Sequence, residues 1–182
     1  ADIVDDLCVA LRTTVGHDFA GYKQTTFVRR VERRMHVLGI SKGSDYLTRV
    51  QTDTNECDAL FRDLLINVTR FFRDRHSFDV LNELAITNLM RDAAGSEDGV
   101  RVWVPGCSSG EEAYTIAVLF AEAARKLDLP CNVQIFATDI DESMLKIARE
   151  GSYPNASLAD IPHELQEHYV IPHKDRFNFI GQ

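Results

Sequence analysis

Two adjacent glutamates, Glu111 and Glu112, follow a turn of small residues in the stretch VPGCSSGEEAYTIA at residues 104–117. An apolar run precedes the turn and a helical pattern follows it, so the turn joins a predicted strand to a predicted helix. Gly106 would let a ligand approach the backbone, and the helix start offers free N–H groups. No Lys-Ser or Lys-Thr pair follows Gly110, and the glutamates would repel a pyrophosphate. They suit a ligand with a cationic group, although they could also only complement the helix dipole.

A further acidic residue, Asp139, ends the second predicted strand in the stretch FATDID at residues 136–141. In Rossmann-like folds an acidic side chain at this place binds ribose hydroxyls. The alternative is a helix cap, but Asp141 is better placed for that role, with Ser143 as another candidate. A small turn, an acid after the second strand and acids where pyrophosphate would sit indicate S-adenosylmethionine. That cofactor has a ribose, an ammonium and a sulfonium, but no phosphate.

Polar residues also surround two phenylalanines in the stretch INVTRFFRDRHSF at residues 66–78. Asn67, Thr69 and Arg73 precede the predicted α/β region, and an arginine there could bind a carboxylate in bidentate fashion. From spacing alone the alternative is favoured, in which Phe71 and Phe72 are core residues and Arg73 faces solvent.

A basic stripe marks the second predicted helix, where only Glu32 opposes Lys23 and four arginines: Arg29, Arg30, Arg33 and Arg34. In a chain of net charge −8, these residues form a candidate docking surface for an acidic partner. The alternative is a solvated helix face. Nucleic acid is not expected as a partner, because the net charge is negative and no nucleic-acid motif is present.

The elements that must position these residues fall into three segments. Helical periodicity predicts an all-helical domain over residues 1–70 and a connecting helix over residues 71–94. From residue 95 to 182 the order of strand, helix, strand and helix predicts an α/β fold with a parallel sheet. Two strands are clear, at residues 100–106 and 132–141, and a third is possible at residues 175–181. We therefore expect an incomplete Rossmann-like sheet.

Other features exclude several classes of protein. The cysteines are scattered and lack zinc-ligand spacing, so no metal is expected: Cys8, Cys57, Cys107 and Cys131. No apolar stretch is long enough to span a membrane, and the acidic N-terminal segment does not read as a signal peptide. A cytoplasmic location is the default expectation.

Taken together, these motifs resemble the chemotaxis receptor methyltransferases, the CheR family. NVTRFFRD is similar to the family's N-x-T-x-F-F-R signature, VPGCSSGEEAYTIA to its first-strand motif, and FATDID to its ribose-binding strand end. YKQTTFVRRVERRM followed by YLTRV resembles its N-terminal helical domain. The motifs occur in the family's order over the whole chain, and this favours a functional role for Arg73.

The resemblance implies methyl transfer from S-adenosylmethionine to glutamate side chains on chemoreceptor helical bundles, giving methyl esters and S-adenosylhomocysteine. Asn67, Thr69 and Arg73 would contact the cofactor or the substrate side, with Arg73 as the catalytic candidate that orients the acceptor glutamate. Glu112 would meet the cofactor's amino-acid end, and Asp139 its ribose. The basic stripe would lie along the acidic receptor bundle, in a protein that does not insert into membranes.

The family pattern also continues beyond what this sequence matches. It includes an asparagine-leucine segment, an Arg-Asn motif, a tyrosine on a later strand and a small β-subdomain that contacts receptors. We expect all of these to be missing here, so that the chain alone would bind cofactor weakly and turn over poorly. Two other readings stay open: a non-catalytic homologue that binds the cofactor or a receptor, and a nucleic-acid-modifying protein.

Overall fold

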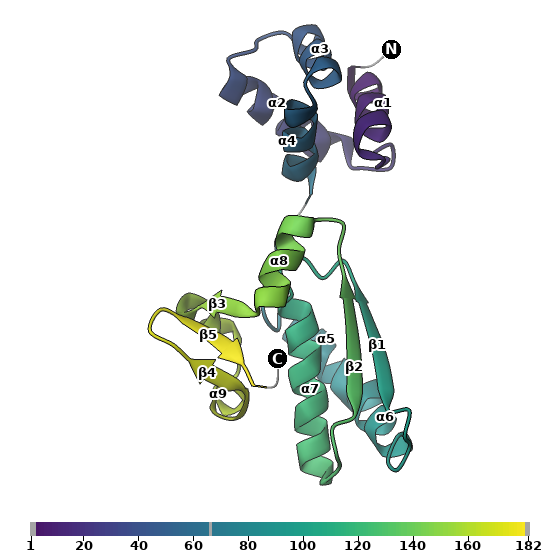
Figure 1. The fold of residues 1–182 in the computed structure, drawn as a ribbon, viewed down its shortest axis with the longest axis vertical. Coiled ribbons are helices and arrows are strands. Elements are labelled where there is room, and N and C mark those ends of the chain that lie inside the picture. Colours follow the sequence, from purple (N-terminus) through teal and green to yellow (C-terminus); the bar gives the residue numbers. More distant parts are fainter. Residues whose placement is uncertain (1–2, 66, 181–182) are drawn as a thin grey trace. The chain divides into compact units, whose positions relative to one another are not determined.

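The computed structural model describes residues 3–65 and 67–180, and the chain divides into two compact units after residue 66 (Figure 1). The first unit is helical, as predicted, with α1 (Ile3–Val15), α2 (Gln24–Leu38), α3 (Gly43–Thr52) and α4 (Thr54–Leu64). It ends four residues before the predicted boundary at residue 70. The reason is that the segment after residue 66 makes its hydrogen bonds to the second unit, for example from Asn67 to Asp141.

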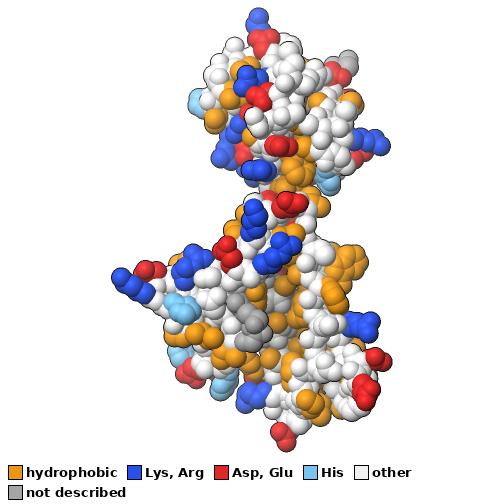
Figure 2. Space-filling view, viewed as in Figure 1, with side chains coloured by type: hydrophobic (Ala, Val, Ile, Leu, Met, Phe, Trp, Pro, Cys, Tyr) orange, Lys and Arg blue, Asp and Glu red, His pale blue; other side chains and the backbone are white. Residues whose placement is uncertain are grey.

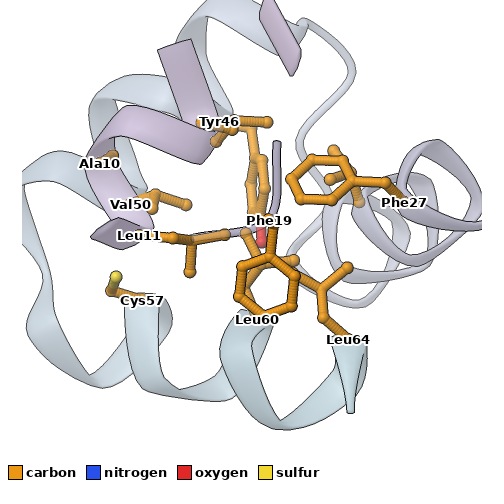
Figure 3. Close-up of a cluster of buried hydrophobic side chains, with 11 residues drawn as sticks. Ala10, Leu11, Phe19, Phe27, Tyr46, Val50, Cys57, Leu60 and Leu64 are labelled. Atoms are coloured by element: carbon orange, nitrogen blue, oxygen red, sulfur yellow. The ribbon is translucent and has the colours of Figure 1, made fainter. Parts of the chain in front are cut away.

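The core of the helical unit follows from apolar residues at helical spacing (Figure 3). On α2, Phe27 and Val31 lie one turn apart and are both buried. They meet fully buried side chains from the other helices, among them Leu11, Tyr46 and Leu60. Each helix of this unit therefore contributes one apolar face to a single core.

The second unit starts with a non-helical segment, residues 67–74, and continues through α5 (Arg75–Leu81), a π-helical turn η1 (Asn82–Ile86) and α6 (Thr87–Asp92). The helix expected over residues 71–94 therefore begins later, at Arg75, and runs to Asp92 through a π-helical turn. Phe72 has a φ of +48°, a left-handed conformation that no helix continues through, and the Asp74 side chain accepts the first capping bond of α5. Ile86 and Met90 are buried in the core of the second unit, so this segment belongs to that unit.

A parallel pair of strands, β1 (Val100–Pro105) and β2 (Val133–Thr138), flanks α7 (Glu111–Leu127), and α8 (Glu142–Glu150) follows β2. The strands run in register from the pair Val100–Val133 to the pair Pro105–Thr138. Their carboxyl ends therefore meet at the same edge, where parallel sheets bind ligands. This arrangement confirms the predicted α/β order and the incomplete Rossmann-like sheet.

One face of this sheet packs on α7, while the other is open. Val104 is only 2% exposed, whereas Trp103 and Phe136, which pair across the strands, are 69% and 50% exposed. Figure 2 shows hydrophobic side chains on the surface over these strands. Among the described residues no helix has the length and apolar character needed to cross a membrane.

A second, antiparallel sheet lies on the other side of α7 (Figure 1). It has the strand order β3-β5-β4, from β3 (Ser152–Pro154), β4 (Val170–Pro172) and β5 (Arg176–Phe179), with a 3₁₀ turn η2 (Asn155–Asp160) and α9 (His163–Tyr169) in between. The possible third strand at residues 175–181 is present as β5, but it pairs antiparallel in this second sheet and does not extend the parallel one. The chain thus contains a small β-sheet, although the β-subdomain of the family was expected to be missing. Only residues 173–175 separate β4 from β5, and so short a connection permits only antiparallel pairing.

Candidate functional site

The turn between β1 and α7, residues 106–110, lies at the carboxyl edge of the parallel strands. Gly106, Ser108 and Gly110 all have positive φ values, of +68°, +49° and +98°. A Cβ atom at Gly106 would meet nothing within 4 Å, so there is open space beside this backbone. The turn therefore offers a ligand close access at its first residue.

The end of β2 holds this turn in place. Cys107 N–H donates to the Thr138 carbonyl at 3.0 Å, which extends the parallel ladder by one bond. Ser108 N–H donates to Asp139 Oδ2 at 2.7 Å, and Asp139 Oδ1 accepts the Asp141 N–H at 2.8 Å. Both carboxylate oxygens of Asp139 are thus oriented by backbone donors, and each can accept further hydrogen bonds.

The two glutamates of the first turn of α7 differ in their surroundings. Glu111 is half-buried and accepts a hydrogen bond from Ser109 Oγ at 2.6 Å. Glu112 is exposed, and within residues 3–65 and 67–180 no hydrogen bond or ion pair occupies its carboxylate. Glu112, the predicted partner of a cationic group, is therefore the more accessible of the two glutamates, and both of its carboxylate oxygens can accept hydrogen bonds.

The 67–74 segment reaches the same edge. Asn67 Nδ2 donates to Asp141 Oδ2 at 2.8 Å, two residues beyond Asp139. The Phe72 N–H donates to Thr115 Oγ1 at 3.2 Å, and this hydroxyl in turn donates to the Glu111 carbonyl at 2.7 Å. The segment with the N-x-T-x-F-F-R pattern is therefore fixed beside both the turn and the end of β2.

Asp141 plays the capping role that the sequence favoured for it. Its side chain accepts the Ser143 and Met144 N–H groups at the start of α8. Burial alone would raise the pKa of Asp141, but hydrogen bonds from Ser143 and Asn67 outweigh it and lower the pKa below the usual range. The side chain thus stays ionised and leaves Asp139 as the carboxylate available for a ligand.

Arg73 and Thr69 occupy the outer part of the same segment. Arg73 is exposed, and its Nη1 donates to the Val68 carbonyl at 2.8 Å. Phe71 and Phe72 are 1% and 7% exposed, so the interpretation of these two as core residues is confirmed. Thr69 is half-buried. The structure does not bring Arg73 into contact with Glu112 or Asp139, so its predicted role stays a prediction.

The basic stripe on α2 is only partly free. Arg34 donates to both carboxylate oxygens of Glu56, at 3.0 and 2.6 Å, and Tyr46 donates to the same carboxylate at 2.8 Å. Arg33 lies 3.9 Å from Asp63 and is largely exposed. Arg29 is exposed and Arg30 is half-buried. A docking role for this helix therefore rests on Arg29, Arg30 and Arg33, because Arg34 is already engaged.

Two supporting residues carried no signal in the sequence. The Tyr153 hydroxyl on β3 donates to the Ser109 carbonyl at 2.7 Å, across 44 positions of the chain. Thr115 is fully buried in α7, where it joins the 67–74 segment to the first helical turn. Unlike a threonine on a helix surface, Thr115 is completely buried, and the sequence alone does not predict this burial.

The polar atoms around the turn fit a ligand that has hydroxyls and a positive charge. Ser108 Oγ is buried and, among the described residues, has no hydrogen-bond partner. Carboxylates lie at both sides, in Glu112 and Asp139, and the turn itself carries no cation. These donors and acceptors suit a nucleoside attached to an amino acid better than they suit a phosphate.

A neighbouring groove does not contain this chemistry. It has a volume of about 340 Å³, adjoins the turn at Gly110, and is lined mainly by apolar residues of α7, β2 and α8. None of the predicted site residues lines it: Asn67, Thr69, Arg73, Gly106, Glu112 and Asp139. The candidate ligand site is therefore the open polar edge of the sheet rather than this groove.

Comparison with known proteins agrees with the two-unit fold. Residues 67–181 match the family described as CheR methyltransferase, SAM binding domain, and residues 4–65 match CheR methyltransferase, all-alpha domain. S-adenosylmethionine is accordingly the cofactor of the second unit. In the described part of the chain, no group of His, Cys, Asp and Glu residues could hold a metal ion.

Individual relatives point to the same family. The chain is 33% identical to chemotaxis protein methyltransferase 2 of Pseudomonas aeruginosa, over 86% of this chain and 53% of that protein. It is 32% identical to the chemotaxis protein methyltransferase of Salmonella typhimurium, over 90% of this chain and 54% of that protein. An uncharacterized 104.1 kDa protein of Rhodobacter capsulatus is 39% identical over 84% of this chain and 16% of its own length.

The chain spans about half the length of the chemotaxis methyltransferases that it matches. The family description covers most of the chain, and the three motifs that suggested it converge on one edge of the parallel strands. The chain therefore belongs to the CheR methyltransferase family.

Proposed function

We propose that this chain takes part in transferring a methyl group from S-adenosylmethionine to glutamate side chains of chemoreceptor cytoplasmic domains. The products are glutamyl methyl esters and S-adenosylhomocysteine. The observation that supports this proposal most directly is the convergence of Asn67, Asp139 and the 106–110 turn at one edge of the sheet. The names of the relatives, chemotaxis protein methyltransferase, support the choice of substrate.

Different residues at the carboxyl edge of the parallel strands bind different parts of the cofactor. Asp139, already oriented by two backbone N–H groups, accepts hydrogen bonds from the ribose hydroxyls. Glu112 pairs with the ammonium of the amino-acid end, and Gly106 leaves room for the ligand beside the backbone. Asn67 and Thr69 would contact the ligand from the 67–74 segment. These contacts fix the ligand's orientation, which is the main contribution required of the protein.

Little proton transfer is needed for this reaction. When bound, the cofactor supplies a methyl group on a sulfonium, and its transfer to a carboxylate oxygen forms a C–O bond as the C–S bond breaks. The acceptor glutamate is ionised at neutral pH, so no general base is required. Arg73 has free guanidinium donors beside the one given to Val68, and these would orient the acceptor carboxylate.

The helical unit supplies recognition of the acidic receptor bundle in this proposal. Arg29, Arg30 and Arg33 offer positive charge on one helix, and charge complementarity favours association with an acidic surface. Since the charges are partly exposed, we expect the association to weaken as the salt concentration rises.

Calorimetry with S-adenosylhomocysteine tests the cofactor site. We expect the chain to bind it and Asp139→Asn to lower the affinity about tenfold or more, because an oriented charged acceptor is lost. Glu164→Gln, at an exposed position on α9, is the matched control and should bind like the unsubstituted chain. Absence of binding heat even at millimolar ligand would contradict the site.

Methyl transfer from labelled cofactor to receptor-derived helical bundles tests the activity. Arg73→Lys should lower the rate, because a lysine cannot hold a carboxylate in bidentate fashion.

Arg33→Glu should weaken transfer and leave cofactor affinity unchanged, and Arg12→Glu on α1 is its control. Equal loss of transfer and cofactor affinity in Arg33→Glu would rule out the docking role. Cofactor binding without any transfer would favour a regulatory homologue.

A further inference from the structure

The antiparallel sheet contacts the 106–110 turn through the hydroxyl group of Tyr153. Tyr153 on β3 is 2% exposed, and its hydroxyl donates to the Ser109 carbonyl at 2.7 Å. Ser109 also donates through its own side chain to Glu111, at 2.6 Å. The neighbouring Ser108 is bonded to Asp139 from the other direction. The middle of the turn is therefore held from the end of β2 on one side and from β3 on the other.

The Tyr153 hydroxyl also leaves no room for a side chain at position 110 of the turn. A Cβ atom at Gly110 would lie 2.8 Å from the Tyr153 oxygen and 2.9 Å from Ala148 Cβ. Gly110 also has a φ of +98°, which L side chains rarely adopt. The turn thus lies in direct contact with the Tyr153 hydroxyl, and a side chain at Gly110 would overlap it.

Tyr153 is itself held rigidly by aromatic neighbours. Its ring centroid lies 4.9 Å from that of Phe71 and 5.7 Å from that of Tyr114, both in edge-to-face geometry. In the sheet it pairs with Phe177, which is fully buried. Burial, together with the charge of Glu111, raises the pKa of Tyr153 far above its usual range. The hydroxyl therefore keeps its proton and remains a donor at any physiological pH.

We propose that Tyr153 is a positioning residue for the cofactor turn, and that the antiparallel sheet supports the cofactor site through its hydroxyl. The inference rests on the proposed function, since it assigns Tyr153 to the same site. Ser109 and Gly110 connect the ligand-approach point at Gly106 to the first turn of α7, which carries Glu112. Without this hydrogen bond the turn would be less ordered in the free protein. Ordering it on ligand binding would then cost free energy and lower the affinity.

The test compares two tyrosine-to-phenylalanine variants, each lacking one hydroxyl of the same unit. Tyr153→Phe removes the bond to Ser109, and Tyr169→Phe removes the bond to Glu122 at 2.9 Å, away from the turn. For each we would measure S-adenosylhomocysteine affinity, the thermal midpoint, and amide hydrogen exchange of residues 106–112. We expect Tyr153→Phe to weaken binding about three- to tenfold and to speed exchange in this segment. Tyr169→Phe should lower the thermal midpoint and change neither the affinity nor this exchange.

The outcomes separate the possibilities. If Tyr153→Phe lowers only the thermal midpoint, as Tyr169→Phe does, and binds the ligand normally, the hydroxyl is merely structural and the inference is overturned. If the unsubstituted chain does not bind the ligand, the cofactor site proposed above fails instead. In that case the exchange of residues 106–112 still decides whether Tyr153 holds the turn.

Discussion

Each unit buries a glutamate that accepts hydrogen bonds from an arginine and a tyrosine, and the two groups differ in where their partners come from. In the helical unit, Glu56 on α4 binds Arg34 on α2 and Tyr46 on α3, and Tyr46 is fully buried. In the second unit, Glu122 binds Arg125 on its own helix and Tyr169 on α9. The Arg125 side chain is 52% exposed, whereas that of Arg34 is 19% exposed.

The comparison shows two uses of buried polar groups. In the helical unit the polar contacts of Glu56 join three helices, and one of its partners, Tyr46, belongs to the core. In the second unit Asp139 and Tyr153 bond to the 106–110 turn at Ser108 and Ser109, and Thr115 bonds to Glu111 just after it. That turn still has an unpartnered hydroxyl at Ser108 within the described structure. In the helical unit these hydrogen bonds connect the helices to one another. In the second unit they fix the conformation of the 106–110 turn, which lies at the exposed edge of the parallel strands.

The largest effect is expected where the buried ion pair joins helices. Glu56→Ala should destabilise the helical unit by about 3 to 5 kcal/mol, because Arg34 and the Tyr46 hydroxyl lose their buried partner. Urea unfolding followed by far-UV circular dichroism measures this. Arg12→Ala, which removes an ion pair with an exposed arginine, should cost less than about 1 kcal/mol. Similar costs for the two variants would show that the Glu56 cluster does not join the helices.

A substitution at Gly110 tests whether the contacts of the 106–110 turn also contribute to stability. Gly110→Ala should destabilise the second unit by about 2 to 4 kcal/mol, because it combines backbone strain with overlap at Tyr153 and Ala148. Gly106→Ala is the matched comparison, since it has positive φ but open space, and should cost about 1 kcal/mol. Thermal unfolding compares the two. Equal destabilisation would mean that contact with Tyr153 does not constrain the turn.

The hydrogen bonds to the Glu122 carboxylate predict that the stability of the second unit depends on pH. The hydrogen bond from Arg125, opposed by burial and aided by Tyr169 and Lys126, lowers the pKa of Glu122 from 4.5 to about 2. Because the folded pKa lies below the unfolded one, the stabilisation is complete above about pH 4.5 and is lost as the pH falls through about 2. We expect this stabilisation to be about 1 to 3 kcal/mol, since the Arg125 and Lys126 side chains are 52% and 65% exposed and water screens their charges.

Glu122→Gln is the variant that isolates this contribution. Its stability should fall less than that of the unsubstituted chain between about pH 5 and pH 2, as measured by urea unfolding at a series of pH values. A stability difference between the two proteins that does not change over this range would contradict the role assigned to the carboxylate.

The smallest expected effect concerns the link between the 67–74 segment and α7. Thr115→Val keeps the side-chain shape but leaves the Phe72 N–H without its acceptor, at a cost of about 1 kcal/mol. We also expect weaker binding of S-adenosylhomocysteine, because Asn67 and Thr69 belong to the segment that this bond fixes. Thr87→Val, whose hydroxyl donates to Asn82 in the π-helical turn, should leave ligand binding unchanged. Loss of binding in both variants would point to a general effect of destabilisation.

Local patterns in the sequence predicted where several residues of the candidate site lie in the fold. The apolar runs of β1 and β2, the small-residue turn and the acids after β2 predicted the edge where Asp139 lies, and Asp141 was correctly favoured as a helix cap. The direction of the last strands was not predicted, because alternation in residues 176–179 has the same period in parallel and antiparallel sheets. The short connection at residues 173–175 was the available signal.

Contacts between distant residues had no local pattern to reveal them. Asn67 and Asp141 are 74 positions apart, and Tyr153 and Ser109 are 44 positions apart. Arg34 shares the basic stripe with Arg33 in the sequence, and only the packing of α2 against α4 shows that it pairs with Glu56. Residue type and spacing thus identify which groups can act, while the fold decides which of them remain available.

The single tryptophan, Trp103, gives the second unit a spectroscopic signal of its own. It is the only tryptophan in the chain, and its indole N–H donates to Thr138 at 3.0 Å, next to Asp139. Its fluorescence therefore reports on the carboxyl edge of the parallel strands, while circular dichroism sees the helices of both units. If the emission and the dichroism change at different urea concentrations, the two units unfold as independent cooperative blocks. The same indole provides an intrinsic optical readout for cofactor titrations without any attached label.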